Sequence, residues 1–310
     1  VSDFGLNDAI EAGLVKTPRV VVRDDALPDA KTLRPKLYHI YRDAEVADDL
    51  NRKAEPHEPL PKLVQDAYTL LGADWRAAAA DWRSLGHPSP PVLLTVCNRT
   101  ETAARVEHYL AKGHTHWPEL HAPERTLRVD SRVLDKAELG EIAGTDKDYE
   151  AKLKAIVEAA AIPGERKLRV AALTKEELLR EMVDNVGKAG TIGQDLQSVV
   201  SVAMLSEGWD AKNVTHIMGL RAFTSQLLCE QVIGRGLRRV AYDLDENGLF
   251  KPEFVNVFGV PLSIYQDIGG GETPPPPKAS TQIEALPERN ALEIRWPNVL
   301  RVDTVMRPTL

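Results

Sequence analysis

The sequence contains only two cysteines, Cys97 and Cys229, among its 310 residues. They do not have the spacing of a metal-binding motif, and both stand in apolar stretches. A cysteine-ligated metal site is therefore excluded. We interpret both cysteines as reduced core residues of a cytoplasmic protein.

Long hydrophobic runs are also absent. No stretch approaches the length of a membrane span and no signal peptide is visible, so no membrane partner is expected. The net charge of -7 argues against a protein that coats nucleic acid, although a local basic groove remains compatible with it. Because the chain opens at Val1, we expect it to be part of a longer polypeptide.

A Gly-rich phosphate loop is missing as well. Val186-Gly187-Lys188-Ala189 lacks both the glycine spacing and the hydroxyl residue of such a loop. Asp24-Asp25 follows a short apolar stretch, but the residues that would complete an acidic Mg²⁺-binding motif are absent. The 310-residue chain by itself is therefore not expected to hydrolyse ATP.

Three histidines, His114, His116 and His121, stand close together in a loop-like stretch. No cysteine or further ligand completes a tetrahedral set beside them, so we expect no metal site.

The most informative stretch begins with VVSVAM, Val199–Met204, which is β-branched and apolar and predicts a buried parallel strand. A polar turn follows, and Val214–Leu220 predicts a second strand. A helix is expected from about Thr224, with Thr224 or Ser225 as its N-cap.

That helix is expected to carry Gln231, Arg235 and Arg238 on one narrow face, because each residue advances about 100° around a helix. Arg239 falls outside this face. An amide and two guanidiniums suit a phosphate-bearing ligand, since planar arginine forks match phosphate oxygens. The alternative, that the arginines complement the helix dipole on a solvated surface, remains open.

The turn before the second strand reads Glu207-Gly208-Trp209-Asp210. A glycine lets the backbone approach a ligand closely, and ligands of open α/β sheets bind at the carboxyl ends of strands. We therefore predict that the turn and the arginine-bearing helix share one site at that edge of the sheet.

These residues resemble known motifs. Gln231–Arg238 looks like motif VI of superfamily 2 helicases, and Ser201–Asp210 looks like their motif V. The sequences of these motifs most resemble those of the restriction subunit of type III restriction-modification enzymes. Other matching stretches are Asp8–Val20, Asp130–Glu138 and Leu292–Asp303.

The resemblance implies an α/β fold, with a RecA-like parallel sheet sandwiched by helices, a helical insertion at 131–190 and a short β-rich C-terminal extension. It implies four parts: a connector from a missing first RecA-like domain (1–60), the second RecA-like domain (61–265), a Gly/Pro-rich linker (266–290) and the start of a β element (291–310).

The resemblance also implies roles for the motif residues. Arg238 would be the arginine finger on the γ-phosphate of ATP, Arg235 a second phosphate-facing arginine, and Gln231 the residue that orients them. ATP and Mg²⁺ would be bound mainly by the first domain. Further nucleotide contacts would come from Glu207, Gly208, Asp210 and Gly234.

A second polar turn follows the apolar strand Val92–Val96 and precedes a helix. It resembles motif IV, whose turn faces the nucleic-acid backbone, so Asn98 and Arg99 are candidates for that contact. The alternative is that Asn98 or Thr100 only caps the helix. Ser201 is a third candidate, close to the position of a DNA-contacting threonine in motif V.

Two further expectations concern the scaffold. Lys62–Leu85 has helical spacing of apolar residues and is expected to break near Gly72. For Trp75 and Trp82, core packing is favoured over stacking on nucleic-acid bases. Leu168–Ala172 predicts a strand.

The favoured interpretation is the C-terminal motor domain of an ATP-dependent DNA helicase or translocase. The parent enzyme would act on double-stranded DNA with a DNA methyltransferase subunit as partner, and its restriction endonuclease activity would reside outside this sequence. Two alternatives stay open: the motor of another superfamily 2 defence or repair protein, and a non-motor interaction module with a degenerate helicase fold.

Overall fold

The computed structural model describes residues 5–20, 37, 40–129, 147–202 and 209–261. The chain divides into two compact units, Val1–Gly270 and Gly271–Leu310, and all described residues belong to the first. The sequence predictions for residues 266–290 and 291–310, for Asp24-Asp25, and for Glu207 and Gly208 lie outside the described residues.

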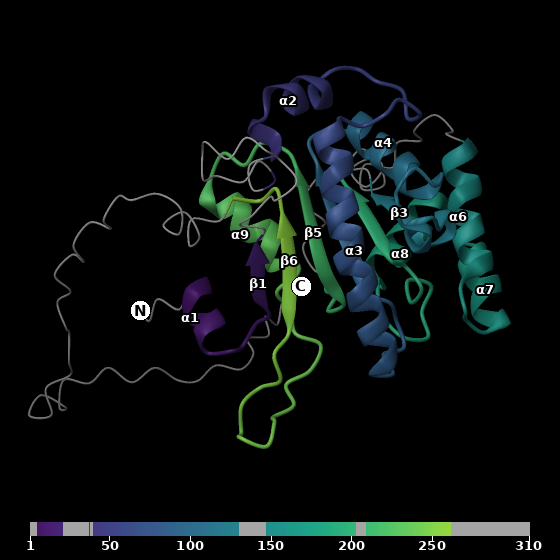
Figure 1. Ribbon diagram of the computed structural model, residues 1–310. Helices are drawn as coiled ribbons and strands as arrows, with labels where there is room; N and C mark the ends of the chain where they lie inside the picture. Colours follow the sequence, from purple (N-terminus) through teal and green to yellow (C-terminus); the bar gives the residue numbers. More distant parts are fainter. Residues whose placement is uncertain (1–4, 21–36, 38–39, 130–146, 203–208, 262–310) are drawn as a thin grey trace, which may run out of the picture. The chain divides into compact units, whose positions relative to one another are not determined.

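The described strands form one parallel sheet in the order β1-β6-β5-β2-β4-β3 (Figure 1). The parallel α/β arrangement expected from the sequence is confirmed. The strands are β1 (Thr17–Val20), β2 (Val92–Cys97), β3 (Thr126–Val129), β4 (Ser198–Ser201), β5 (Val214–Leu220) and β6 (Phe254–Phe258).

Helices cover both faces of the sheet, and within the described residues none is long and apolar enough to cross a bilayer. The longer helices are α1 (Leu6–Glu11), α2 (Ala44–Asn51), α3 (Lys62–Ser84), α4 (Thr100–Ala111), α6 (Lys147–Ala159), α7 (Gly164–Ala171), α8 (Lys175–Asp184) and α9 (Gln226–Gly234). Short 3-10 turns are η1 (Ile40–Arg42), η2 (Pro118–Leu120) and η3 (Pro123–Arg125).

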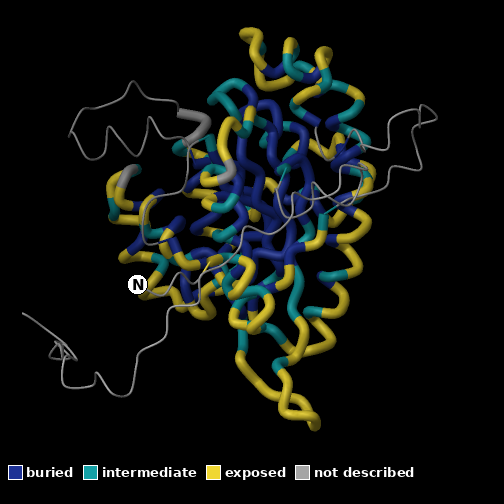
Figure 2. The backbone as a smooth tube through the Cα atoms, turned by 90° about the vertical axis from the view of Figure 1, so that its left-hand side faces the viewer, coloured by how far each residue is buried: buried dark blue, intermediate teal, exposed yellow. Residues whose placement is uncertain are grey.

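The two central strands, β2 and β5, are buried along their whole length. Their sequences, VLLTVC and VTHIMGL, are nearly continuous apolar runs, as expected for parallel strands with helices on both faces. Figure 2 shows the sheet as the buried centre and places the exposed residues on the outer helices.

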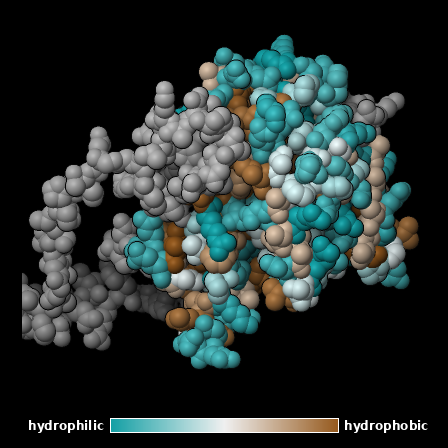
Figure 3. All heavy atoms as spheres, viewed as in Figure 1, coloured by the Kyte–Doolittle hydropathy of each residue, from teal (hydrophilic) through white to brown (hydrophobic). Residues whose placement is uncertain are grey.

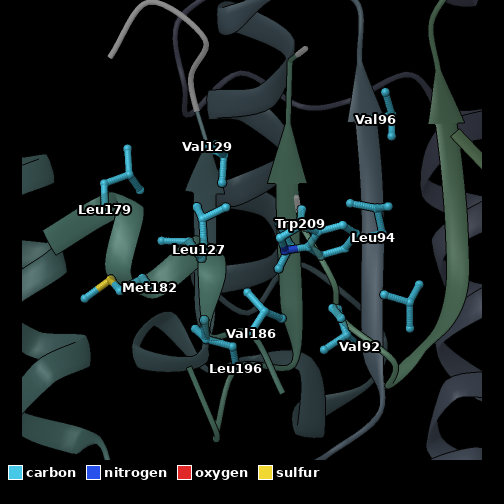
Figure 4. Close-up of a cluster of buried hydrophobic side chains, with 14 of the residues drawn as sticks. Val92, Leu94, Val96, Leu127, Val129, Leu179, Met182, Val186, Leu196 and Trp209 are labelled. Atoms are coloured by element: carbon cyan, nitrogen blue, oxygen red, sulfur yellow. The ribbon is translucent and has the colours of Figure 1, made fainter. Parts of the chain in front are cut away.

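Each face of the sheet has its own apolar cluster. The first contains side chains of α6, α8 and α9, together with the indole of Trp209 (Figure 4). The second contains side chains of α2, α3 and α4. The sheet thus separates α3 from α9, and sites on these two helices lie on opposite faces.

Helix α3 runs unbroken from Lys62 to Ser84, so the expected break near Gly72 is wrong. A Cβ at Gly72 would collide with the Trp117 ring. This glycine permits close packing instead of interrupting the helix. The outer surface of α3 is mostly hydrophilic, with scattered apolar patches (Figure 3).

The strand expected at Leu168–Ala172 is also wrong, because these residues lie in and directly after helix α7. Pro163 precedes its first turn, and Val170 is buried while Leu168 is 75% exposed. Residues two positions apart lie about 200° apart on a helix but share one face of a strand, so the opposite burial of Leu168 and Val170 fits the helix. The short apolar run in the sequence did not distinguish the two.

Strand β1 lies in the range expected to form a connector, yet it pairs with β6 in the sheet. Lys16, directly before β1, is buried and fixes this strand. Its Nζ donates to the carbonyls of Lys212 (2.6 Å) and Val214 (2.7 Å), and its backbone N–H donates to the carbonyl of Leu237 (2.7 Å). Burial lowers the pKa of Lys16 to about 8, and the nearby Glu253 partly offsets this effect.

The lowered pKa predicts that stability rises with pH. Between pH 8 and the ordinary lysine pKa of 10.5, the unfolded chain binds more protons at Lys16 than the folded chain does. The free energy of unfolding of the wild type, minus that of Lys16→Met, should increase by about 2 kcal/mol between about pH 7.5 and pH 10. Urea unfolding of both proteins at several pH values measures this difference in the free energy of unfolding. A difference that does not vary with pH would contradict the buried placement of Lys16.

Candidate functional site

Helix α9 begins as the sequence predicts, with the Ser225 hydroxyl accepting a hydrogen bond from the Leu228 N–H (3.2 Å). It ends earlier than expected, at Gly234. Arg235 is its C-cap, and Arg238 lies beyond it, in neither a helix nor a strand. The expectation that Gln231, Arg235 and Arg238 share one helix face is therefore wrong, because the 100° repeat does not continue past the helix end.

The two arginines nevertheless converge on the same backbone atom. Arg235 Nη1 donates to the Trp209 carbonyl at 3.5 Å, and Arg238 Nη1 donates to that same oxygen. Arg238 Nε also pairs with Asp210 Oδ1 at 3.3 Å. The turn before β5 and the chain after α9 thus meet at one place.

This meeting point lies toward the starts of the strands and not at their carboxyl ends. Lys16 joins Leu237, the neighbour of Arg238, to the first residues of β1 and β5. Asp210 stands shortly before Val214, where β5 begins. The expectation of a site at the carboxyl edge of the sheet is wrong for the arginines, since α9 runs back along the sheet before it ends.

The ion pair at this point is partly exposed, since the side chains of Arg238 and Asp210 are 39% and 49% exposed. Arg238 uses Nε and Nη1 in these contacts, which leaves Nη2 without a partner among the described residues. A guanidinium held through Nε and Nη1 can still donate from Nη2 to an anion such as a phosphate.

The other residues predicted for this site are placed as follows. Gln231 is exposed on α9. A Cβ added to Gly234 would meet no described atom within 4 Å, so no packing within the described part requires a glycine there. Glu207 and Gly208 lie outside the described residues.

No protein-family model and no curated protein matches the sequence. Among solved structures, the chain is similar to a fragment of a putative HsdR subunit of a type I restriction enzyme from Vibrio vulnificus YJ016. The sequence identity is 16% and the TM-score is 0.36. The match covers 84% of this chain and 35% of that one, so this chain spans about a third of its neighbour. The fold assignment rests on the strand order above and not on this likeness.

The turn after β2 has a structural role that the sequence did not reveal. Asn98 Nδ2 donates to the Leu50 carbonyl (3.0 Å) and to Asn51 Oδ1 (3.0 Å), and Arg99 donates to the Asn51 carbonyl. Both side chains therefore bind the end of α2 to the carboxyl end of β2.

The capping alternative for this turn is wrong in detail. Arg99 occupies the N-cap position of α4 and makes no side-chain capping bond, so neither Asn98 nor Thr100 is the cap. Arg99 remains partly exposed, with Glu101 Oε2 3.4 Å from its Nε.

Ser201, the third candidate for a nucleic-acid contact, is buried at the end of β4 and only 1% exposed. A contact with a nucleic-acid backbone would need this side chain to be uncovered. Near the predicted histidine cluster, His121 Nε2 lies 2.9 Å from the Thr115 carbonyl. No cluster of three potential ligands is placed to hold a metal ion within the described ranges.

Sequence reasoning missed the residue that organises the site, Trp209. Its indole is fully buried in the cluster shown in Figure 4, and its carbonyl receives both arginines. A large apolar side chain in an otherwise polar turn was the available signal.

The neighbouring arginines Arg238 and Arg239 have different environments, which predicts different effects of their removal. Arg239 is 4% exposed, donates to the carbonyls of Ala241 and Lys251, and lies 3.5 Å from Glu253. Arg239→Ala should lower the free energy of unfolding by about 2 to 4 kcal/mol, whereas Arg238→Ala should change it by less than about 1 kcal/mol. Chemical denaturation of both variants checks this, and equal losses would contradict the partly exposed placement of Arg238.

The two glycines of the same stretch give a second contrast. A Cβ at Gly236 would lie 2.8 Å from Ile217 Cδ1 and 2.9 Å from Val255 Cγ2, both part of the sheet. Gly236→Ala should therefore destabilise the fold by about 1 to 3 kcal/mol through overpacking. Gly234→Ala should be neutral or stabilising by up to about 1 kcal/mol, because alanine is favoured in helices. Thermal unfolding distinguishes the two, and a destabilised Gly234→Ala would show that the end of α9 is packed differently.

Proposed function

We propose that the chain is the C-terminal motor domain of an ATP-dependent DNA helicase or translocase, of the kind found in type III restriction enzymes. In this proposal the parent protein is cytoplasmic and acts on double-stranded DNA. A first RecA-like domain of the same polypeptide binds ATP and Mg²⁺, and a DNA methyltransferase subunit is the partner.

The observation that supports this proposal is the convergence of Arg235 and Arg238 on the Trp209 carbonyl beside Asp210. These residues belong to the two stretches that resemble motifs V and VI. They come together although 26 and 29 residues separate Trp209 from the two arginines in the sequence, and Arg238 remains partly exposed.

The geometry fits a phosphate at the boundary of a second domain. Asp210 and the Trp209 carbonyl hold Nε and Nη1 of the Arg238 guanidinium and so position it. Nη2 would donate to the γ-phosphate of ATP held by the first domain, and Arg235 would add a second cation. A fixed guanidinium stabilises the charge that builds on a transferred phosphoryl group, and this effect is worth about a thousandfold or more in rate.

The proposal predicts that Arg238→Ala in the full-length protein lowers DNA-stimulated ATP hydrolysis by about a thousandfold. Arg238→Lys should not restore it, because an ammonium cannot make both the positioning bond and the phosphate contact in one plane. Steady-state phosphate release measures both variants. Arg169→Ala, an exposed arginine on α7, is the matched control and should retain wild-type turnover.

Retained ATPase activity and translocation in Arg238→Ala would disprove the finger role of this arginine. The isolated chain should show no DNA-stimulated hydrolysis. If purified chain does hydrolyse ATP and Arg238→Ala abolishes this, the whole nucleotide site would have to lie within these residues, against the proposal.

A further inference from the structure

A cavity of about 440 Å³ lies on the α3 face of the sheet, away from Arg235 and Arg238. The C-terminal half of α3 forms one wall. The opposite wall is formed by segments that lead into three strands: Pro88–Pro91 before β2, Arg125 before β3 and Gln197 before β4. Its volume is in the range of small-molecule sites.

The first feature of this cavity is an aromatic pair. The rings of Trp82 and His87 lie 4.3 Å apart between centroids, and the His87 N–H donates to the Trp82 carbonyl (3.2 Å). Core packing was favoured for both tryptophans of α3, and this holds for Trp75, which is 3% exposed. Trp82 is only half-buried and lines the cavity.

The second feature is positive charge. Arg76, Arg83 and Arg125 line the cavity together with the carboxylates of Glu119 and Asp195. Arg76 pairs with Glu119 at 2.7 Å, and Asp195 Oδ2 accepts a hydrogen bond from the Ala161 N–H at 3.0 Å. Arg83 donates from Nε to the Ala79 carbonyl (3.2 Å), and no carboxylate in the described part of the chain pairs with Arg83 or Arg125.

The third feature is a wall built from hydrogen-bonded loops. Trp75 Nε1 donates to the Pro91 carbonyl (2.9 Å) and Asn213 Nδ2 donates to the Pro90 carbonyl (2.7 Å). The Gln197 amide donates to the Glu119 carbonyl (2.9 Å), while its backbone N–H donates to the Arg125 carbonyl (2.9 Å). These bonds fix the cavity wall without a ligand, which lowers the entropic cost of binding.

We propose that this cavity binds a nucleoside phosphate, with the base stacked against Trp82 and the phosphate held by Arg83 and Arg125. An aromatic platform next to unpaired arginines is the chemistry that recognises a base joined to a phosphate. Such a ligand is either a free nucleotide or one nucleotide of a single DNA strand. Trp82 and His87 also line a neighbouring cavity of about 520 Å³, so Trp82 borders two cavities that a strand could follow.

The test measures binding of two probes to the 310-residue chain: AMP by calorimetry, and an eight-nucleotide thymidine oligonucleotide by fluorescence anisotropy. Trp82→Ala should weaken binding about tenfold or more through loss of stacking. Arg83→Ala combined with Arg125→Ala should weaken it about tenfold and reduce its salt dependence. Trp82→Phe keeps an aromatic ring and should retain most of the affinity.

Two controls separate this site from the proposed motor function. Arg169→Ala removes an exposed arginine from α7, and Arg238→Ala removes the arginine of the other site; neither should change the affinity. If only AMP binds, the ligand is a free nucleotide. If only the oligonucleotide binds, or if it binds more tightly than AMP, the ligand is a DNA strand. Each of these results supports the cavity as a binding site. The proposal is overturned if neither probe binds, if Trp82→Ala and the double arginine variant bind like wild type, or if Arg238→Ala removes the binding.

Discussion

The complete burial of the Trp209 indole is the constraint on which the candidate site depends. The side chain is held in the apolar cluster on the α9 face, which anchors the backbone at Trp209 to the sheet. The carbonyl of the same residue is thereby fixed where the chain leaves α9. Arg235 and Arg238 can both donate to the Trp209 carbonyl oxygen because the burial of the indole, and not the arginines, sets the position of that oxygen.

Close packing at the end of α9 supports this arrangement. Gly236 has no room for a side chain against Ile217 and Val255, which brings the segment after the helix directly onto the sheet. Arg239 then turns to the loop before β6, with its guanidinium beside the rings of Tyr242 (5.8 Å) and Phe250 (5.4 Å). One arginine of the adjacent pair is thus part of the scaffold, and the other, Arg238, remains partly exposed.

Much of the fold was predictable from the sequence, because buried parallel strands and amphipathic helices leave simple patterns. Val214–Leu220 was predicted with its observed limits, and Ser225 was among the predicted caps. The proximity of the two motif stretches was also predictable, although their place relative to the sheet was not. A helical wheel assumes that the helix continues, whereas α9 ends at Gly234, where two closely spaced glycines, Gly234 and Gly236, are a local signal for a helix end.

The remaining errors involve long-range contacts. Asn98 looks like a cap or a ligand-binding residue until its partners at Leu50 and Asn51 are known, and Gly72 looks like a helix breaker until Trp117 is placed beside it. Lys16 looks like a surface lysine, but the carbonyls that accept its hydrogen bonds belong to residues about 200 positions away. These contacts depend on the strand order, which residue patterns do not specify.

The central claim is that Arg235 and Arg238, held beside Trp209 and Asp210, face a phosphate brought by a neighbouring domain. The most direct measurement is a structure of the full-length protein with a non-hydrolysable ATP analogue and Mg²⁺. We predict that the Arg238 guanidinium lies within hydrogen-bond distance of a γ-phosphate oxygen while its contact with the Trp209 carbonyl or Asp210 persists. A nucleotide bound with both arginines remote from its phosphates would contradict the account.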